Sequence, residues 1–365
     1  MTRIVIAGMG DTGVLSAIEL RRRLPDADIV GIATKPGLVS GQELGLRLAR
    51  PDRWSRDYRI AFEDFRGLDG VRIARGAVES VDLVRKQVVV DESALAFDVL
   101  VVATGVRNGF WRQPKVQTAE QVVADLAAAH AQLRAAGSVI VVGGGAAAVA
   151  SAAQLAAAYP STRVDLFFPG DAALPQHHRA VWPRVRQRLE RLGVGLHPGH
   201  RAVVADGFAG ERITTEPVAW TTGQPDSHGD AVLWAIGRVR PNTAFLPGEV
   251  LDEHGFVQVG PDLRVAGTDG VFAIGDVAAT DPLRTSARNW GHRTLGHNVA
   301  AHLAGTALKD YVPPRRRWGS VLGLQADGLV VHLANGRAFR VPLWAVDRIL
   351  QPWITDRGIY RGIRR

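Results

Sequence analysis

The sequence predicts an α/β fold, and two observations carry that prediction. A strand-like apolar run followed by a glycine-rich loop and a helical apolar pattern occurs twice, at residues 3–23 and again at residues 138–159. Each of these two units is followed, further along the chain, by another apolar run that ends in small residues, at residues 97–105 and 232–237. A strand, glycine loop and helix in this order form the unit that holds a pyrophosphate at a helix N-terminus. We therefore predict two Rossmann-like three-layer dinucleotide-binding domains, with a small α+β section at the C-terminus.

The first unit, RIVIAGMGDTG, places its glycines in the spacing GxGxxG directly after a β-branched run. In this motif Gly8 makes the tight turn, Gly10 lets the backbone approach a pyrophosphate, and Gly13 lets the helix pack on the strand. Asp11 and Thr12 lie between these glycines and join them as candidate cofactor contacts. A glycine-rich turn without a ligand is the alternative interpretation.

The second unit repeats the pattern as GxGxxA. Its candidate contacts are Gly143, Gly145, Ala146 and Ala148, and the following helix should end near Tyr159. Residues 135–161 carry no charge, but three glycines and a proline interrupt them, so a strand, turn and helix explain them better than a membrane span. We therefore expect a soluble protein.

Three later segments complete the two units. Ala103, Thr104 and Gly105 end a buried strand run, and Gly237 ends the equivalent run of the second unit. Residues 268–278 should deliver Gly275 and Asp276 to a helix start, where they could reach the phosphate and ribitol of a flavin; Asp276 as a plain helix N-cap is the alternative. Because these segments alternate, the second unit is predicted to be inserted in the first. The expected domains are an FAD-binding domain (1–115 and 245–310), an NAD(P)-binding domain (116–244) and a C-terminal section (311–365).

Composition narrows the chemistry. The 365 residues include no cysteine, which excludes a redox disulfide, a thiol nucleophile and cysteine-ligated metal sites. We find no metal-ligand or Ser/His/Asp pattern, and we predict no metal. The net charge of +8 raises the question of nucleic acid, but no nucleic-acid-binding motif is present and none is expected as a partner. Without a signal peptide or a myristoylation motif, the expected location is cytoplasmic.

These five segments, in this order, resemble the two-dinucleotide-binding-domain flavoproteins of the pyridine nucleotide oxidoreductase class. The likeness is closest to the apoptosis-inducing-factor-like, or ferroptosis-suppressor-like, NAD(P)H:quinone reductases. It rests on residues 140–168, 184–203, 232–245, 263–278 and 295–305. The resemblance implies FAD as cofactor, NADH or NADPH as donor, and a quinone or similar small molecule as electron acceptor.

The chain departs from that pattern at three places. After the second strand of the first unit, Ala33, Thr34 and Lys35 replace the usual acidic residue; Thr34 could bond a ribose hydroxyl, and Lys35 could lie near the adenine. In the second unit this position is Phe168-Pro169, which favours neither NADH nor NADPH, although Arg179 or Arg238 could serve a phosphate. Ala150 replaces a glutamate that relatives carry near the nicotinamide.

The catalytic residues are unknown from sequence, and the candidates come from the resemblance. Gln42 and Glu43 follow the first unit in a region that forms a wall near the flavin in relatives. Asn289 and Trp290 lie near the helix expected after Gly275, where relatives run along the flavin ring. A surface turn and plain packing are the respective alternatives. Val78 completes the candidate FAD contacts.

The C-terminal tail interleaves aromatic and aliphatic residues with arginines. It could lie on an anionic membrane surface, making the protein peripheral to the membrane, or pack on the core with an arginine rim. Two other functions stay open: a flavoenzyme that acts directly on a metabolite with a degenerate NAD(P)H site, and a non-catalytic nucleotide-binding regulator. The oligomeric state is not predicted.

Overall fold

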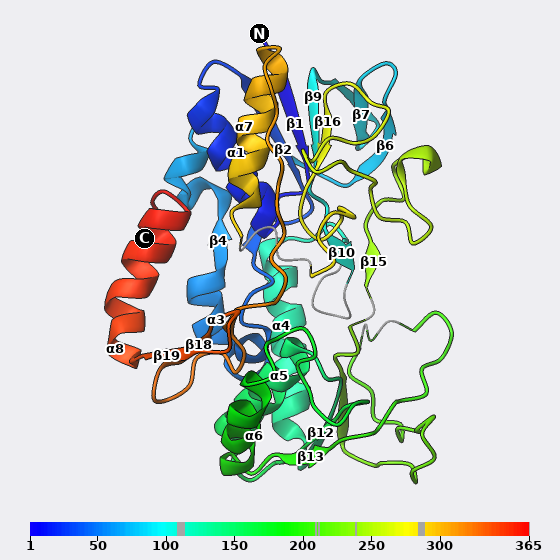
Figure 1. The fold of residues 1–365 in the computed structure, drawn as a ribbon, viewed down its shortest axis with the longest axis vertical. Helices are drawn as coiled ribbons and strands as arrows, with labels where there is room; N and C mark the ends of the chain where they lie inside the picture. Colours follow the sequence, from blue (N-terminus) through cyan, green and yellow to red (C-terminus); the bar gives the residue numbers. More distant parts are fainter. Residues whose placement is uncertain (108–113, 209, 211, 238, 284–288, 365) are drawn as a thin grey trace.

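A computed structural model describes residues 1–107, 114–208, 210, 212–237, 239–283 and 289–364. Its two parallel sheets lie toward opposite ends of the long axis, with the linking segments between them (Figure 1). The mixed α/β architecture predicted from the sequence is confirmed. The limits of the three domains stay predictions.

The first sheet is parallel throughout. Its strands, in spatial order, are β16 (Val271–Ala273), β9 (Val99–Val102), β1 (Arg3–Ala7), β2 (Asp28–Ala33) and β5 (Arg72–Arg75). Strand β16 follows the whole second sheet in the chain, so the C-terminal half of the sequence completes the sheet that the N-terminus begins.

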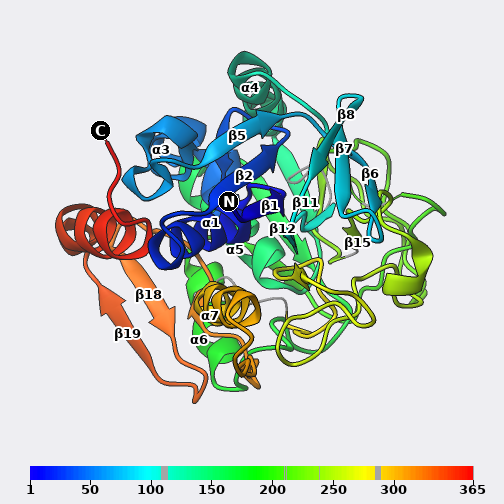
Figure 2. The same ribbon diagram turned by 90° about the horizontal axis from the view of Figure 1, so that it is seen from above.

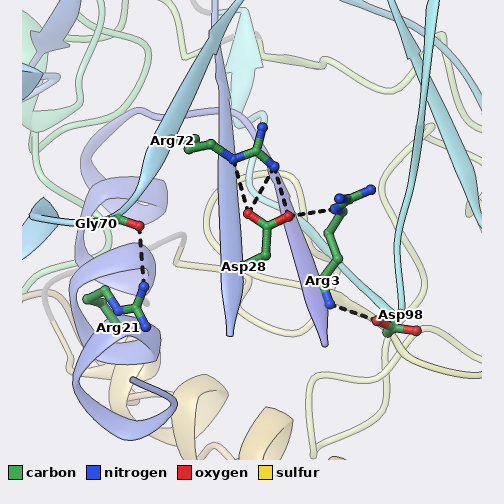
Figure 3. Close-up of polar contacts among 6 residues, drawn as sticks. All are labelled: Arg3, Arg21, Asp28, Gly70, Arg72 and Asp98. Atoms are coloured by element: carbon green, nitrogen blue, oxygen red, sulfur yellow. Dashed lines mark hydrogen bonds and ion pairs between the residues drawn. The ribbon is translucent and has the colours of Figure 1, made fainter. Parts of the chain in front are cut away.

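An ion-pair network joins the strands of this sheet at the end opposite the glycine loop (Figure 3). The Asp28 carboxylate accepts from Arg3 Nε at 2.7 Å and from both Nε and Nη2 of Arg72, while the Arg3 amide donates to Asp98. On α1 (Asp11–Arg23), Arg21 donates to the Gly70 carbonyl. The arginines hold the pKa of Asp28 below its usual value against the opposing effect of burial, which is the largest single contribution.

Side-chain alternation along β1 divides the core of this half into two layers. Ile4 and Ile6 pack under α1 and α7 (Gly291–Leu303), whereas Val5 and Ala7 face the opposite layer (Figure 2). That layer includes the antiparallel sheet of β6 (Val78–Asp82), β7 (Gln87–Val90) and β8 (Ser93–Ala96).

The second sheet is also parallel, with strands β13 (Gly195–His197), β12 (Arg163–Phe167), β11 (Ser138–Val142) and β14 (Ala231–Trp234). Its helices are α4 (Ala119–Ala135), α5 (Ala146–Ala158) and α6 (Val181–Arg191). Thr118 and Gln121 cap α4 reciprocally through side chain and backbone. Apolar residues of α5 and α6 are buried in the same core as strands β11, β12 and β14.

Short elements connect the two halves. The two crossing segments pair as β10 (Val106–Arg107) and β15 (Arg240–Pro241). The segment between β2 and β5 of the first sheet carries β3 (Gly37–Val39), α2 (Leu44–Ala49), α3 (Pro51–Tyr58) and β4 (Arg59–Ala61), and it reaches the second half through α2. Helix α2 lies against α5 so closely that a Cβ built at Gly45 would be 2.5 Å from the Ala150 carbonyl oxygen. Only glycine fits there.

The C-terminal section forms an antiparallel sheet of β17 (Gly319–Ser320), β18 (Leu329–His332) and β19 (Ala338–Val341). After it, α8 (Leu343–Ala345) runs on into a π-helical segment (Val346–Ile359). Tyr360 is buried and its ring meets that of Phe65 edge to face, but Trp344 and Trp353 are 61% and 58% exposed. The C-terminal helix therefore packs through one face, which includes Val346, Gln351 and Asp356, and leaves the two tryptophans exposed.

One expectation about secondary structure is wrong. No helix begins at Asp276; the next described helix, α7, starts at Gly291. The reason is that residues 277–279 pair with Val257, whose amide donates to the Val277 carbonyl and whose carbonyl accepts from the Ala279 amide. This pairing carries the chain away before a helix can form.

Candidate functional site

The two glycine loops share the same backbone arrangement. Gly8 and Gly143 both have positive φ, at +99° and +144°. A Cβ built at Gly8 would lie 2.7 Å from the Ala103 carbonyl oxygen, and one at Gly143 would lie 2.2 Å from that of Ala235. Each first glycine is therefore required both by its backbone conformation and by the neighbouring strand end.

The second glycines need a different explanation. Gly10 and Gly145 have φ of −77° and −88°, which any residue adopts, and a Cβ built at either would meet nothing within 4 Å. Neither folding nor packing demands glycine at these positions. A side chain there would instead fill the space at the helix N-terminus that a pyrophosphate occupies in such loops. The loops thus fit two dinucleotides.

The third positions serve packing alone. A Cβ on Gly13 would lie 1.9 Å from the Gly8 carbonyl oxygen, and Ala148 is fully buried. These two residues and Gly143 do not line the cavity described next.

Both loops open onto one cavity of about 1260 Å³. Ligand pockets commonly measure about 300–1,000 Å³, so this space is larger than one small ligand needs. Its wall includes most of the predicted contacts: Gly8, Gly10, Asp11, Thr12, Thr34, Lys35, Gln42, Val78, Ala103, Thr104, Gly105, Gly145, Ala146, Gly237, Gly275 and Asp276.

The two ends of the chain meet at this cavity. A Cβ on Gly275, which has φ of +87°, would lie 3.0 Å from Thr12 Oγ1, so the late glycine lies against the first loop. Thr104 has its hydrogen-bond partner within the protein. Its hydroxyl donates to the Asn242 carbonyl at 2.8 Å, and the side-chain amide of Asn242 donates back to the Thr104 carbonyl. This reciprocal pair joins the two crossing segments at the cavity.

Lys35 lies at the strand end where an acidic residue was expected. Its ammonium donates to the Lys115 carbonyl and, at 2.6 Å, to Gln117 Oε1. Burial, assisted by the charge of Lys115, lowers the pKa of Lys35 to about 8. The Thr34 carbonyl accepts from the Gln117 amide at 2.9 Å. These contacts fasten the segment that leads into α4 to the end of β2.

The second unit has a wall of small and neutral residues. Gly144, Ala147, Ala150 and Pro169 line it, and the Leu174 amide donates to the Gly144 carbonyl at 2.7 Å. Arg179 is not part of the described wall, and Arg238 falls outside the described residues. Within the described part of this unit's glycine loop and of the segment after β12, no carboxylate or guanidinium reaches the cavity.

The segment that follows β3 is held firmly against the first loop. Asp11 accepts from Ser40 Oγ at 2.6 Å and from the Gly41 amide at 2.8 Å, so its carboxylate positions this segment. Trp54 Nε1 donates to the Gln42 carbonyl. Glu43 comes next, in the left-handed conformation with φ of 52°, and lines the cavity beside Gln42.

Asn289 and Trp290 are not on the described cavity wall, and their flavin contact stays a prediction. The Trp290 ring is 44% exposed and lies under the Arg293 guanidinium at 3.9 Å. Asn289 Oδ1 accepts from Trp318 Nε1 at 2.9 Å, which places Asn289 behind a residue that does line the cavity.

Sequence reasoning missed the contribution of the C-terminal section. Trp318, Val321 and Gly323 line the cavity, and Gln154 of α5 donates to the Leu322 and Leu324 carbonyls at 3.0 and 2.7 Å. No motif marks these residues, because their role depends on which element the tail meets. A glycine-rich loop can be recognised in the sequence because its residues are contiguous. A cavity wall cannot, because its residues come from segments far apart in the chain.

Among the described residues, no group of three or more His, Asp or Glu side chains could hold a metal ion. No helix in the described part of the chain has the length and apolar character needed to cross a bilayer.

Comparison with known proteins agrees with this geometry. Residues 2–305 match the family model described as pyridine nucleotide-disulphide oxidoreductase. Oxidoreductase ptaL of Pestalotiopsis fici is 26% identical, and the alignment covers 96% of this chain and 95% of that protein. Ferroptosis suppressor protein 1 of Xenopus laevis is 27% identical over 85% and 83% of the two chains.

A shorter match and a solved structure extend the comparison. The type II NADH:quinone oxidoreductase Ndh of Mycobacterium tuberculosis is 30% identical over 41% of this chain and 33% of its own. The sulfide:quinone oxidoreductase of Aquifex aeolicus has the same fold, with a TM-score of 0.73 at 15% identity, covering 94% of this chain and 88% of that one.

The family match spans both glycine loops and the segment with Gly275 and Asp276. FAD and NAD(P)H are the cofactors that these loops hold in the family, and the two open glycine positions fit them. The chain therefore belongs to the pyridine nucleotide-disulphide oxidoreductase family and is an FAD-dependent NAD(P)H oxidoreductase.

Proposed function

We propose that this protein passes electrons from NAD(P)H through FAD to a quinone or similar small acceptor, without a redox disulfide. The observation that carries the proposal is the single cavity shared by both glycine loops in a chain that has no cysteine. With no thiol available, the electrons have to leave the flavin directly for an acceptor that enters the cavity. The quinone named for the relative Ndh supports this class of acceptor.

In this proposal the division of the chain follows the sequence prediction. Residues 1–115 and 245–310 hold FAD, residues 116–244 hold NAD(P)H, and residues 311–365 close the cavity. Bound FAD supplies the electron relay, and the protein supplies binding and orientation. The candidate contacts Gly10 and Gly145 leave room for the two pyrophosphates. Titrations with NADH and NADPH decide the donor, because the described residues of the second glycine loop and of the segment after β12 place no charge on the cavity wall that would discriminate the two.

A membrane surface completes the proposal. Five apolar side chains of β19 and the C-terminal helix are each at least 46% exposed: Phe339, Trp344, Ile349, Trp353 and Ile354. The Arg357 guanidinium lies 4.1 Å from the centre of the Trp353 ring. Exposed aromatic residues accompanied by arginine favour the interface of an anionic bilayer, where a quinone dissolves. We call these five residues the C-terminal patch and propose that it contacts a membrane peripherally, from the cytoplasmic side.

The uncharged wall of the second unit also favours a second candidate function. A flavoenzyme that oxidises or reduces a metabolite directly would need the first loop but not a selective NAD(P)H site. The two candidates differ in what reduces the flavin, so one titration distinguishes them.

The test is an anaerobic titration of the purified yellow protein with NADH and, separately, with NADPH. Rapid bleaching of the flavin absorbance by either donor, followed by recovery on adding a short-chain quinone, is the expected result. If the flavin absorbance bleaches but does not recover with quinone, quinone is excluded as the acceptor. Reduction of the flavin by NAD(P)H would still hold. A flavin that neither donor bleaches would favour the direct flavoenzyme.

A further inference from the structure

Glu43 stands between two hollows. Besides the main cavity, it lines a smaller hollow of about 40 Å³, whose wall comes from α2, α3, the C-terminal helix and residues Leu324 and Leu329. A space of this size holds one water molecule. Half of the small hollow is apolar, and its remaining wall consists of Asp57, Tyr58, Asp347 and Gln351 together with Glu43 itself. A water there would find the polar partners that it needs.

The backbone of Glu43 is held in an unfavourable conformation. Its φ of 52° and ψ of 45° lie in the left-handed region, which a residue with a Cβ rarely adopts. The preceding residues are fixed by Asp11 and by Trp54 Nε1, and the Glu43 carbonyl accepts from the Arg47 amide at the start of α2. The surrounding contacts thus hold the backbone at Glu43 in this conformation.

The carboxylate lies where three parts of the molecule meet. A Cβ built at Gly323 would lie 2.4 Å from Glu43 Oε2 and 3.1 Å from Gln154 Nε2. Glu43 comes from the half that contains the first glycine loop, Gln154 from α5 after the second loop, and Gly323 from the C-terminal section. The glycine is what leaves room for the carboxylate.

The overall reaction requires a proton from solvent. Reduction of a quinone follows the balance NAD(P)H + H⁺ + quinone → NAD(P)⁺ + quinol. One C–H bond of the dihydronicotinamide breaks and two O–H bonds form on the quinone oxygens, so each turnover takes up one proton from outside. A side chain on the cavity wall can deliver it as a general acid.

We propose that Glu43 donates this proton to the quinone and is re-protonated through the small hollow. The inference rests on the proposed quinone acceptor. In this step the carboxyl O–H of Glu43 breaks as the quinone O–H forms, and a water in the hollow then returns a proton from bulk solvent. Asp347, whose side chain is 49% exposed, lies at the solvent side of that path, paired with Arg53 at 3.1 Å.

Other described cavity carboxylates are placed differently. On the wall of the main cavity these are Asp11, Glu79, Asp125 and Asp276. None of the four lines the small hollow. Besides Glu43, the charged and titratable residues of the small hollow are Asp57 and Tyr58 of α3 and Asp347 of the C-terminal helix. Those on the wall of the main cavity are Asp11, Lys35, Arg47, Glu79, Arg107, Lys115, Asp125, His177, Asp276 and Arg317. The neighbouring residues Ala150, Gln154 and Gly323 are uncharged.

The decisive experiment compares two acceptors with the holoenzyme. A short-chain quinone takes up protons with its electrons, whereas ferricyanide takes electrons alone. For Glu43→Gln we expect quinone turnover to fall by about 10²-fold, in the range of general acid catalysis, with ferricyanide turnover changed less than about twofold. Flavin bleaching by NAD(P)H and quinone affinity, measured by equilibrium titration of the oxidised protein, should match wild type. Glu249→Gln, on the exposed surface, is the matched control.

In a second pair of variants, one substitution displaces the Glu43 carboxylate without removing it, and the other is its control. Gly323→Ala would displace the Glu43 side chain and should slow quinone but not ferricyanide reduction. Gly305→Ala has nearly the same backbone strain, with φ of +65° against +69°, but meets nothing within 4 Å. Its quinone rate should stay at the wild-type value even if its stability falls equally.

Difference infrared spectroscopy gives a readout that does not depend on turnover. A carboxyl signal that appears on flavin reduction and disappears in Glu43→Gln is expected. An equal loss of turnover with quinone and with ferricyanide in Glu43→Gln would make Glu43 a positioning residue and overturn the proposal. Unchanged quinone turnover in this variant would overturn it as well. A wild-type enzyme that reduces ferricyanide but no quinone would instead overturn the proposed function itself.

Discussion

At the scale of single residues, the glycines of each loop have separable tasks. Gly10 has an ordinary extended backbone and open space around its Cα, whereas Gly13 abuts the Gly8 carbonyl oxygen. The same contrast holds between Gly145 and Gly143 in the second loop. A mutation at the second glycine should therefore act on the ligand, and one at the packing glycine on the fold.

We predict that Gly10→Val lowers FAD affinity at least tenfold while changing apoprotein stability by about 0.5 kcal/mol or less, because its side chain enters only the pyrophosphate space. Gly13→Ala should cost about 3 kcal/mol even without cofactor, because its Cβ collides with backbone. Flavin absorbance and urea denaturation of the apoproteins measure both. Equal destabilisation by the two variants would refute the distinction. Gly145→Val is the matched test for NAD(P)H, and this protein should stay yellow.

His292 supplies a residue-scale prediction about acid stability. It is 6% exposed on α7, and burial lowers its pKa to about 4, with the positive charges of Arg293 and Arg361 acting in the same direction. The folded protein thus binds fewer protons here than the unfolded chain between pH 6.5 and 4. Its neutral form stabilises the fold above pH 6.5, and that contribution is lost as the pH falls through this window.

For this residue we expect wild type to lose about 3 kcal/mol of unfolding free energy between pH 7 and pH 4, relative to His292→Gln. Guanidinium denaturation at half-unit pH intervals measures the difference. A constant gap between the two proteins across this range would contradict the shifted pKa.

At the scale of elements, helix α5 joins all three parts of the molecule. Its alanines allow α2 to approach at Gly45, and its Gln154 holds the C-terminal section by two donated hydrogen bonds. Gln154 is 2% exposed, so no water replaces these bonds if they are lost. The cavity wall at Trp318 and Gly323 depends on this attachment.

Gln154→Glu should destabilise the protein by about 3 kcal/mol, because a buried carboxylate would face two carbonyl oxygens. Hydrogen exchange at residues 320–325 should rise in parallel. Gln121→Glu is the control: its oxygen accepts from the Thr118 amide in the capping box of α4, a bond that a carboxylate also makes. Similar costs for both substitutions would argue against the proposed attachment.

At the scale of the whole molecule, the net charge of +8 and the C-terminal patch act together. A positive protein accumulates at an anionic bilayer, and exposed tryptophans then fix its orientation. The patch lies at one side of the molecule, on the C-terminal helix and β19 (Figure 2).

We predict that wild type co-sediments with anionic phospholipid vesicles and that Trp344→Ser with Trp353→Ser lowers the bound fraction at least fivefold. Neutral vesicles and about 1 M salt should weaken wild-type binding, since both reduce the electrostatic attraction. Val84→Ser removes an apolar side chain that is 94% exposed elsewhere, and its binding should be unchanged. Equal binding by wild type and the double variant would remove the patch from the proposal.

Comparison of sequence and structure shows which features local patterns could predict. The two glycine loops, the strand ends at Gly105 and Gly237 and the approach of Gly275 to Thr12 follow from motifs in which a short segment carries its own geometry. The helix expected at Asp276 did not form, because pairing with the distant Val257 overrode the local preference. Lys35 bonds the segment leading into α4, a partner 80 residues away that no local pattern names.

By itself, the sequence determined the fold class, the pair of dinucleotide sites and the absence of thiol chemistry, since each depends on residue type and short-range spacing. Only the tertiary structure decided that one cavity serves both loops, that Gln154 attaches the tail and that Glu43 lies between two hollows. Those features arise where segments far apart in the chain pack together. Steric fit at Gly45 and Gly323 selects that packing, and no window of sequence contains both sides of such a contact.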